Sequence, residues 1–191
     1  MAKLPDLPPN YAKALELIDA AHALDPRQAA DTSPFELHYA KHMTQWLTLR
    51  CPDASPALQL ACRAQHFRRA GYLTWRAKLK SLAATQVAEL LASPEIEPPI
   101  PADDVSRIAG LIRKENLTTN EETQVLEDVA CLVFLDDQFD EFEKSSGIDE
   151  EKMVGILRKT WGKMSDKGKE LALGMELSDR AKTLIGKALE S

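Results

Sequence analysis

The stretch LEDVACLVFL, residues 126–135, places two adjacent carboxylates, Glu127 and Asp128, directly before seven consecutive apolar residues. A helix that is apolar on every side is normally enclosed by other helices, and an ionised side chain is seldom fully buried without a partner. The two acids therefore either lie at the polar rim of a central helix or point inward to a metal ion, a cation or a substrate. The stretch itself leaves both interpretations open.

Outside this stretch, apolar residues recur at intervals of three and four, and no segment shows the sustained alternation that is typical of strands. The 191 residues suffice for one well-packed core. The sequence therefore predicts an all-α fold, a single-domain helical bundle over residues 1–191 with about seven to nine helices.

Start and stop signals delimit these helices. The expected ranges are 11–25, 33–51, 55–69, 72–92, 103–115, 120–142 and 149–163, with two short helices after Ser165 and Ser178. The clearest start is Ser33-Pro34-Phe35-Glu36, which predicts a capping hydroxyl and a glutamate at the third helical position. Residues 93–102 contain four prolines and predict a loop.

The composition is that of a globular protein, with 44% hydrophobic and 28% charged residues. No apolar run approaches the roughly 20 residues that span a bilayer, and the segment MAKLPDLPPN lacks the apolar core of a secretory signal. The three cysteines show no CxxC spacing, which favours a reducing compartment. We therefore expect a cytoplasmic protein with no membrane partner.

The net charge of −6 disfavours nucleic acid as a partner, because a phosphate backbone requires concentrated positive charge. One local basic group is an exception to the acidic balance. It comprises Arg63, Arg68, Arg69 and Arg76.

Two sets of histidines are candidate metal ligands. His38 and His42 are four residues apart, so on one helix they share a face and could bind one transition metal, although Phe35 and Tyr39 nearby also suit simple packing. His66 lies between an apolar half-turn and the basic group in LACRAQHFRR. Three roles for His66 are consistent with this position: a metal ligand, a proton-transfer group, or a surface histidine beside the arginines.

Glu127 and Asp128 have Gln124 on the same side of the expected helix, one turn earlier. Paired acids supply metal ligands or a general base, and apolar surroundings raise the pKa of a carboxylate that has no partner. The alternative is a salt bridge to cations of the preceding helix. These cations are Arg107, Arg113 and Lys114.

A short motif at residues 163–167, KMSDK, is similar to the KMSKS loop of class I aminoacyl-tRNA synthetases. The chain has no HIGH-type element and no alternating strand-helix pattern for a nucleotide-binding sheet. The sequence therefore argues against a synthetase, and Ser165 is better explained as the N-cap of a short helix.

Four segments together resemble a family of small bacterial and fungal proteins described as a domain of unknown function, DUF4202. These segments are AQHFRR (64–69), GYLTWR (71–76), TQVLEDVACLVFL (123–135) and ILRKTWGKMS (156–165). The resemblance runs from about Tyr11 to the C-terminus and implies a shared polar set. The matching residues are Glu36, Gln65, His66, Trp75, Arg76, Gln124, Glu127 and Asp128.

The chain departs from this family pattern in three places. Family members carry a proline-containing stretch with a tryptophan between QHxxR and YLxWR, whereas here Gly71-Tyr72 follows Arg69 almost directly. A site that uses this stretch as a wall would be impaired in this chain. A histidine often found on the fourth helix is replaced near Ala83, and His38 is not a family position.

The order of these elements is also similar to that of the HD-type phosphohydrolases, helical proteins whose metal is held by a histidine, a His-Asp pair and a later aspartate. His38 or Glu36, then His66, then Asp128 would occupy these places. The residue after His66 is Phe67, so the defining aspartate is missing. The resemblance therefore favours an HD-like scaffold more than a working HD metal centre.

The leading hypothesis is a pocket between the second, third and central helices, lined by Glu36, Gln65, His66, Glu127 and Asp128. It would perform metal-assisted hydrolysis of a small phosphorylated or nucleotide substrate. His66 and Asp128 would hold a divalent metal, and Glu36 or Glu127 would orient the attacking water. Arg69 or Arg76 would neutralise the phosphate.

The alternative hypothesis is a non-catalytic helical module that binds a small anionic ligand or a partner protein. The acids and arginines would then form an internal ion-pair network. A tryptophan would supply an apolar contact. The candidates are Trp46, Trp75 and Trp161.

Overall fold

The computed structural model describes residues 3–67 and 76–190. In these residues the secondary structure is helical apart from one isolated bridge between Gln28 and Pro34, which confirms the predicted all-α class. Contacts group the chain into two compact units, residues 1–126 and 127–191. We call them the N-terminal and C-terminal units and describe each by itself; the prediction of one domain over the whole chain stays a prediction.

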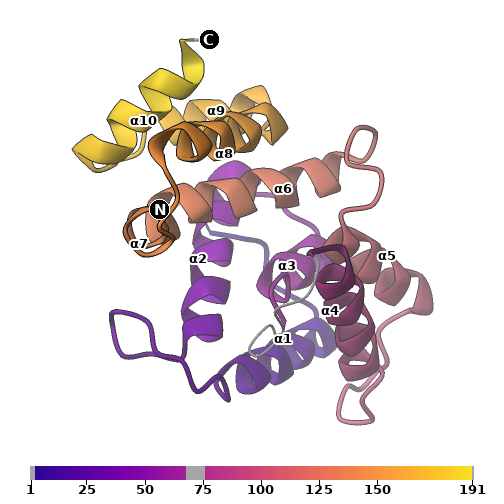
Figure 1. Cartoon of the computed structure of the whole chain (residues 1–191). Helices are drawn as coiled ribbons and strands as arrows, with labels where there is room; N and C mark the ends of the chain where they lie inside the picture. Colours follow the sequence, from indigo (N-terminus) through magenta and orange to yellow (C-terminus); the bar gives the residue numbers. More distant parts are fainter. Residues whose placement is uncertain (1–2, 68–75, 191) are drawn as a thin grey trace. The chain divides into compact units, whose positions relative to one another are not determined.

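The described part of the N-terminal unit contains five helices and the first residues of a sixth (Figure 1). They are α1 (Pro9–His22), α2 (Phe35–Arg50), α3 (Pro56–Arg63), α4 (Arg76–Leu91), α5 (Ala102–Arg113) and the start of α6 (Glu121–Val133). Helix α3 packs against α1, α2 and α5, and every residue from Ala57 to Arg63 is buried. The short helix α3 is therefore the inner element of this unit.

The C-terminal unit contains the rest of α6 and the elements that follow it. They are the π-helical turn η1 (Phe134–Gln138), α7 (Phe139–Ser145), α8 (Glu150–Lys163), α9 (Asp166–Leu173) and α10 (Asp179–Leu189). Helix α10 packs on α8. The single long helix predicted over residues 120–142 is thus interrupted at η1, where the backbone changes its hydrogen-bond spacing.

Several predicted helix starts are confirmed. The hydroxyl of Ser55 accepts a hydrogen bond from the Leu58 N–H, Ser165 accepts from Gly168, and Ser178 accepts from Ala181. Each bond satisfies one of the backbone donors that a helix leaves open in its first turn. Burial also raises the pKa of the Cys62 thiol on α3, as expected of a cysteine that fills space like a small apolar residue.

The predicted cap at Ser33 is wrong. The Ser33 hydroxyl instead donates to Asp31, and the backbone N–H of Glu36 in the first turn of α2 donates to Asp25 Oδ2 at 3.1 Å. A carboxylate from the start of the connection between α1 and α2 therefore caps α2. The same carboxylate also pairs with Arg27.

Two helix bounds differ from prediction in ways that affect the site. The third helix was expected to extend through Arg69, but α3 ends at Arg63, and residues 64–67 form turns that carry His66. The start expected for the fourth helix at residue 72 lies outside the described residues. None of the described helices is long and apolar enough to cross a membrane.

Tyr11 joins α1 to α5 because its hydroxyl donates to the Asp104 carboxylate. Burial, followed by the hydrogen bond and charge of Asp104, raises the Tyr11 pKa to about 12. Because the Tyr11 pKa is higher in the folded than in the unfolded protein, the protonated hydroxyl contributes to the free energy of unfolding. This contribution is complete below the unfolded pKa of about 10 and is lost as the pH rises towards 12. We expect the wild type to lose it between pH 10 and 12, and we expect Tyr11→Phe to lack it at every pH.

Urea unfolding of both proteins at a series of pH values from 8 to 12 measures this difference. Other groups that titrate in this range act equally on both proteins, so the difference between them isolates Tyr11. Parallel curves for the two proteins would contradict the role of the Tyr11–Asp104 bond.

Candidate functional site: a buried polar cluster in the N-terminal unit

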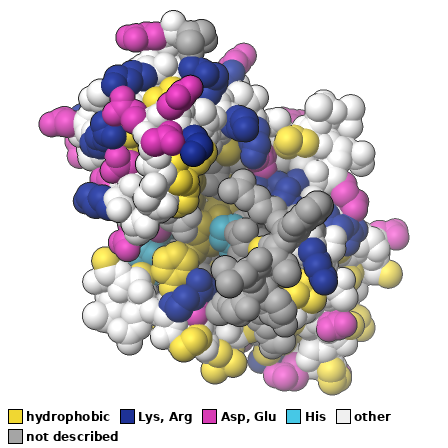
Figure 2. All heavy atoms as spheres, in the orientation of Figure 1, with side chains coloured by type: hydrophobic (Ala, Val, Ile, Leu, Met, Phe, Trp, Pro, Cys, Tyr) yellow, Lys and Arg dark blue, Asp and Glu magenta, His cyan; other side chains and the backbone are white. Residues whose placement is uncertain are grey.

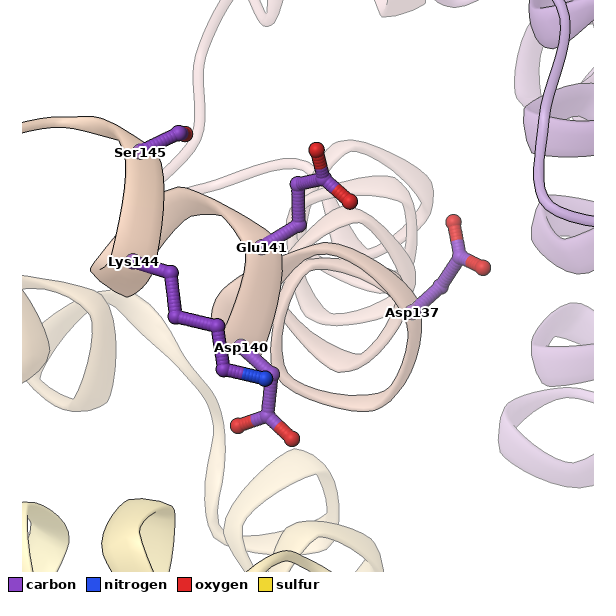
Figure 3. Close-up of a pocket in the computed structure, with 5 residues that line it drawn as sticks. All are labelled: Asp137, Asp140, Glu141, Lys144 and Ser145. Atoms are coloured by element: carbon purple, nitrogen blue, oxygen red, sulfur yellow. The ribbon is translucent and has the colours of Figure 1, made fainter.

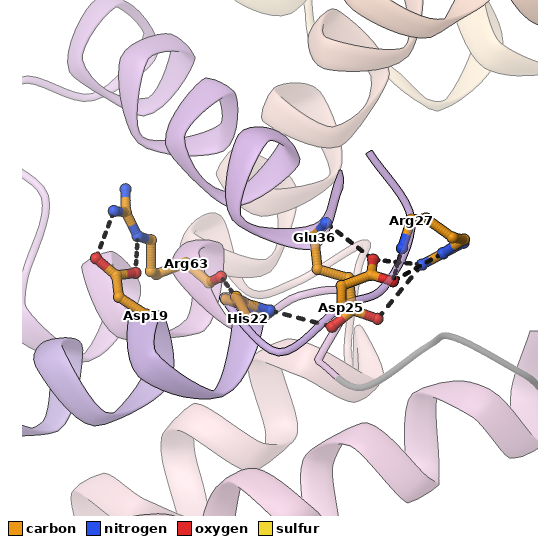
Figure 4. Close-up of polar contacts among 6 residues, drawn as sticks. All are labelled: Asp19, His22, Asp25, Arg27, Glu36 and Arg63. Carbon is orange, nitrogen blue, oxygen red and sulfur yellow. Dashed lines mark hydrogen bonds and ion pairs between the residues drawn. The ribbon is translucent and has the colours of Figure 1, made fainter. Parts of the chain in front are cut away.

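A buried histidine joins three helices of the N-terminal unit. His22, the last residue of α1, is 1% exposed, and its Nε2 lies 3.0 Å from the carbonyl oxygen of Arg63 on α3. Its Nδ1 lies 3.3 Å from Oε2 of Glu36 on α2, which is 4% exposed. Figure 4 shows these contacts. The sequence placed His22 only on an inward-facing stripe and did not identify it as a site residue.

The partners of His22 constrain the roles of its two ring nitrogens. A carbonyl oxygen only accepts, so the hydrogen bond to Arg63 requires a proton on Nε2. The other ring nitrogen, Nδ1, faces the Glu36 carboxyl group. His22 therefore joins α1 to α3 as a donor and brings α1 into contact with α2.

Two arginines flank this pair. Arg63 makes two bonds to Asp19, Nε to Oδ1 at 2.6 Å and Nη2 to Oδ2 at 2.7 Å, and its Nη1 donates to Thr44 at 2.9 Å. Arg27 donates to both oxygens of Asp25 and lies 3.6 Å from Oε1 of Glu36. We call His22, Asp25, Arg27 and Glu36 the polar cluster.

The charges of the polar cluster compensate one another. The Asp25 side chain is completely buried, whereas half of the Arg27 side chain is exposed. Burial by itself would raise the pKa of Asp25, but the hydrogen bonds and charge of Arg27 and the bond from the Glu36 N–H outweigh burial and lower it. Asp25 is therefore an ionised, fully partnered acceptor at neutral pH.

His66 and Gln65 both contact Tyr39 of α2. The Tyr39 hydroxyl donates to Gln65 Oε1 at 3.1 Å, and its ring stacks on His66 with centroids 4.0 Å apart and planes 10° apart. Gln65 is buried, and His66 is partly exposed. The structure therefore places the predicted residues Glu36, Gln65 and His66 in one unit, on or beside α2.

Asp128 has a defined structural role in the C-terminal unit. It is fully buried, its Oδ1 accepts from the Ser165 N–H at 2.8 Å, and its Oδ2 accepts from the Ser165 hydroxyl at 2.5 Å. A Cβ added to Gly168 would lie 2.8 Å from Asp128 Cγ, so only glycine allows this close approach. Asp128 thereby holds the start of α9 against α6.

Glu127 pairs with a different cation from those the sequence suggested. Its Oε1 lies 3.5 Å from Lys163 Nζ at the end of α8. Of the proposed partners, Arg107 pairs with Glu122, and Arg113 pairs with Glu115. The ion pair of Glu127 with Lys163 thus involves a later helix than the one that the sequence suggested.

The predicted site residues fall into both units. Glu36 and His66 belong to the N-terminal unit, and Glu127 and Asp128 belong to the C-terminal unit, so the shared pocket stays a prediction. Arg69 lies outside the described residues, and the side chain of Arg76, at the start of α4, is also not described.

A hollow of about 480 Å³ lies on η1 and α7 of the C-terminal unit (Figure 3). Its lining is Asp137, Asp140, Glu141, Lys144 and Ser145. Three carboxylates against one ammonium make this hollow a poor site for a phosphate or another anion. Over α8–α10 of the same unit, basic and acidic side chains are interspersed (Figure 2), with ion pairs such as Arg180–Glu143 and Lys187–Glu150.

The model of a family described as a domain of unknown function, DUF4202, matches residues 12–185. The chain belongs to the DUF4202 family. The match includes the polar cluster, Tyr39 with His66, and Asp128 with Ser165. No curated protein and no solved structure shows significant similarity to the chain.

Removal of His22 tests the polar cluster of this DUF4202 protein. His22→Ala leaves Glu36 buried beside Asp25, and we expect the free energy of unfolding to fall by about 3–5 kcal/mol, as for other broken buried pairs. The double variant His22→Leu/Glu36→Leu removes both members and should recover part of this loss. Urea unfolding of His22→Leu, Glu36→Leu and the double variant measures the coupling between the two residues, and strictly additive losses would contradict the pairing.

Gly168→Ala tests the close packing of Asp128. The new Cβ would contact Asp128 Cγ, and we expect a destabilisation of about 1–3 kcal/mol, as for other overpacked sites. Gly155→Ala is the matched control, because Gly155 is an interior helical glycine with nothing within 4 Å of the added Cβ. This control should stabilise the protein by about 0.5–1 kcal/mol. Equal effects in thermal unfolding would contradict the assigned contact.

Proposed function

We propose that this protein is a non-catalytic helical module that binds a small anionic ligand on α2 of its N-terminal unit. The strongest support for this proposal is that the carboxylates that hydrolysis would require are already held in contacts within the protein. Asp128 accepts two hydrogen bonds from Ser165, and Glu36 contacts both His22 and Arg27. Acids that are held in internal contacts within their own unit support a binding role over a hydrolytic one.

Helix α2 provides donors for an anion. Its only carboxylate, Glu36, is buried in the polar cluster. Four donor side chains share one stripe at helical spacing, namely His38, Lys41, His42 and Gln45, and both Lys41 and Gln45 are exposed. We call this stripe the donor face of α2.

The donor face suits a phosphate or carboxylate group because it offers N–H donors with positive charge and no acid of its own. Trp46, one turn after His42 and partly exposed, adds an apolar surface for the rest of a ligand. A nucleoside phosphate or a phosphorylated metabolite has both parts.

Calorimetric titration with inorganic phosphate, citrate and ATP, in the presence of a chelator, tests this proposal. We expect saturable binding that Lys41→Glu weakens by roughly tenfold or more, because an acid would then face the anion. Lys152→Glu is the matched control, since it makes the same charge change on exposed α8 and should leave the affinity unaltered. Equal effects of the two reversals, or no binding of any anion, would contradict the proposal.

Metal-assisted hydrolysis of a small phosphorylated or nucleotide substrate is the second candidate function. The observation that favours it is the contact between His22 and Glu36, two titratable groups that lie near the half-exposed guanidinium of Arg27. Such a pair could act as a general acid or base. Metal-dependent turnover that Glu36→Gln abolishes in a folded protein would support this second function over the first.

A further inference from the structure

Two histidines of α2 have a geometry that suits one transition-metal ion. His38 and His42 are one helical turn apart, their ring centroids are separated by 4.3 Å, and the planes are tilted by 31°. A ring nitrogen of His38 lies within 4.8 Å of one of His42. Ligand bonds of about 2.0–2.1 Å bring two imidazole nitrogens to a common ion after small rotations of the rings.

Asp31 orients the first of these rings. Its Oδ2 lies 3.2 Å from Nδ1 of His38. An ionised carboxylate only accepts, so Nδ1 carries the proton, and the lone pair of the neutral ring lies on Nε2. A carboxylate that fixes the tautomer and orientation of a histidine in this way is the usual outer partner of a metal-binding imidazole.

Asp31 is itself held in place by its own loop. The Ser33 hydroxyl and the Ser33 N–H both donate to Oδ1, at 2.6 and 3.0 Å. These two bonds, and to a lesser extent the contact with His38, lower the Asp31 pKa to about 2, so the carboxylate is ionised at neutral pH. The bridge between Gln28 and Pro34 closes the loop around them.

We propose that Nε2 of His38 and a ring nitrogen of His42 bind one divalent transition metal of the class that prefers nitrogen ligands, such as Zn²⁺, Ni²⁺ or Cu²⁺. Asp31 is a positioning residue for His38. Two protein ligands leave coordination positions for water or for an anion, so a bound metal would also strengthen the donor face of α2. The metal site itself does not depend on the proposed anion binding.

Calorimetry with the metal alone, on protein freed of metal by a chelator, tests the site without any anion. We expect one ion per chain, with Cu²⁺ bound more tightly than Ni²⁺ or Zn²⁺ and no binding of Mg²⁺, as imidazole ligands dictate. His38→Ala and His42→Ala should each weaken binding by roughly tenfold or more, and Asp31→Asn by about ten- to a hundredfold.

His66→Ala is the matched control, because it removes a histidine of the same unit that stacks on Tyr39 and lies outside the proposed ligand pair. It should retain the wild-type affinity. Electron paramagnetic resonance of the Cu²⁺ complex should show two coupled imidazole nitrogens in the wild type and one in either His38→Ala or His42→Ala. Thermal unfolding without metal verifies that each variant is folded.

The result that overturns the proposal is wild-type affinity in both His38→Ala and His42→Ala, or the absence of binding by Cu²⁺, Ni²⁺ and Zn²⁺. Loss of binding in His66→Ala alone would also overturn it, in favour of the metal role that the sequence suggested for His66. Wild-type affinity in Asp31→Asn would remove the positioning role. Metal binding without anion binding would leave this site standing and contradict only the proposed function.

Discussion

The imidazole of His22 is the contact on which the N-terminal unit depends, because it joins the end of α1, the start of α2 and the end of α3. Each partner is a group that is costly to bury alone: a carboxylate from Glu36 and a backbone carbonyl from Arg63. Loss of the imidazole would remove one polar contact from each of them, and Glu36 would keep its contact with Arg27. The helices are therefore constrained by polar geometry as well as by the apolar core around α3.

The same constraint positions the candidate surface. Glu36 and Asp25 hold the first turn of α2, one through the side chain and one by accepting the Glu36 N–H. With this turn fixed and Tyr39 directed to Gln65 and His66, the opposite stripe of α2 carries Lys41 and Gln45, which are exposed. His38 and His42 lie on this stripe and are partly buried, so the buried Glu36 and this pair of histidines are two consequences of one helix orientation.

The sequence predicted those features that follow from local periodicity and local capping. The helical class, the proline-rich loop at residues 93–102 and the caps at Ser55, Ser165 and Ser178 all depend on residues within a few positions of each other. The cap at Ser33 failed because a more distant carboxylate, Asp25, competes for the same helix start. Local signals do not reveal such competition.

The candidate site was less accessible to sequence reasoning. The apolar stripe of α1 placed His22 inside, and a histidine at a helix C-terminus followed by Asp25 and Arg27 is a signal that could have marked it. Glu127 and Asp128 were correctly singled out as buried acids that need partners, but their partners Lys163 and Ser165 lie more than thirty residues away. Pairings at that separation require the fold.

Nitrogen-15 NMR of the histidine rings tests the central claim most directly. The account predicts that Nε2 of His22 carries the proton that it donates to the Arg63 carbonyl oxygen. A His22 ring whose lone pair lies on Nε2 would contradict it, because two acceptors would then face each other and α1 would not be joined to α3 through this histidine.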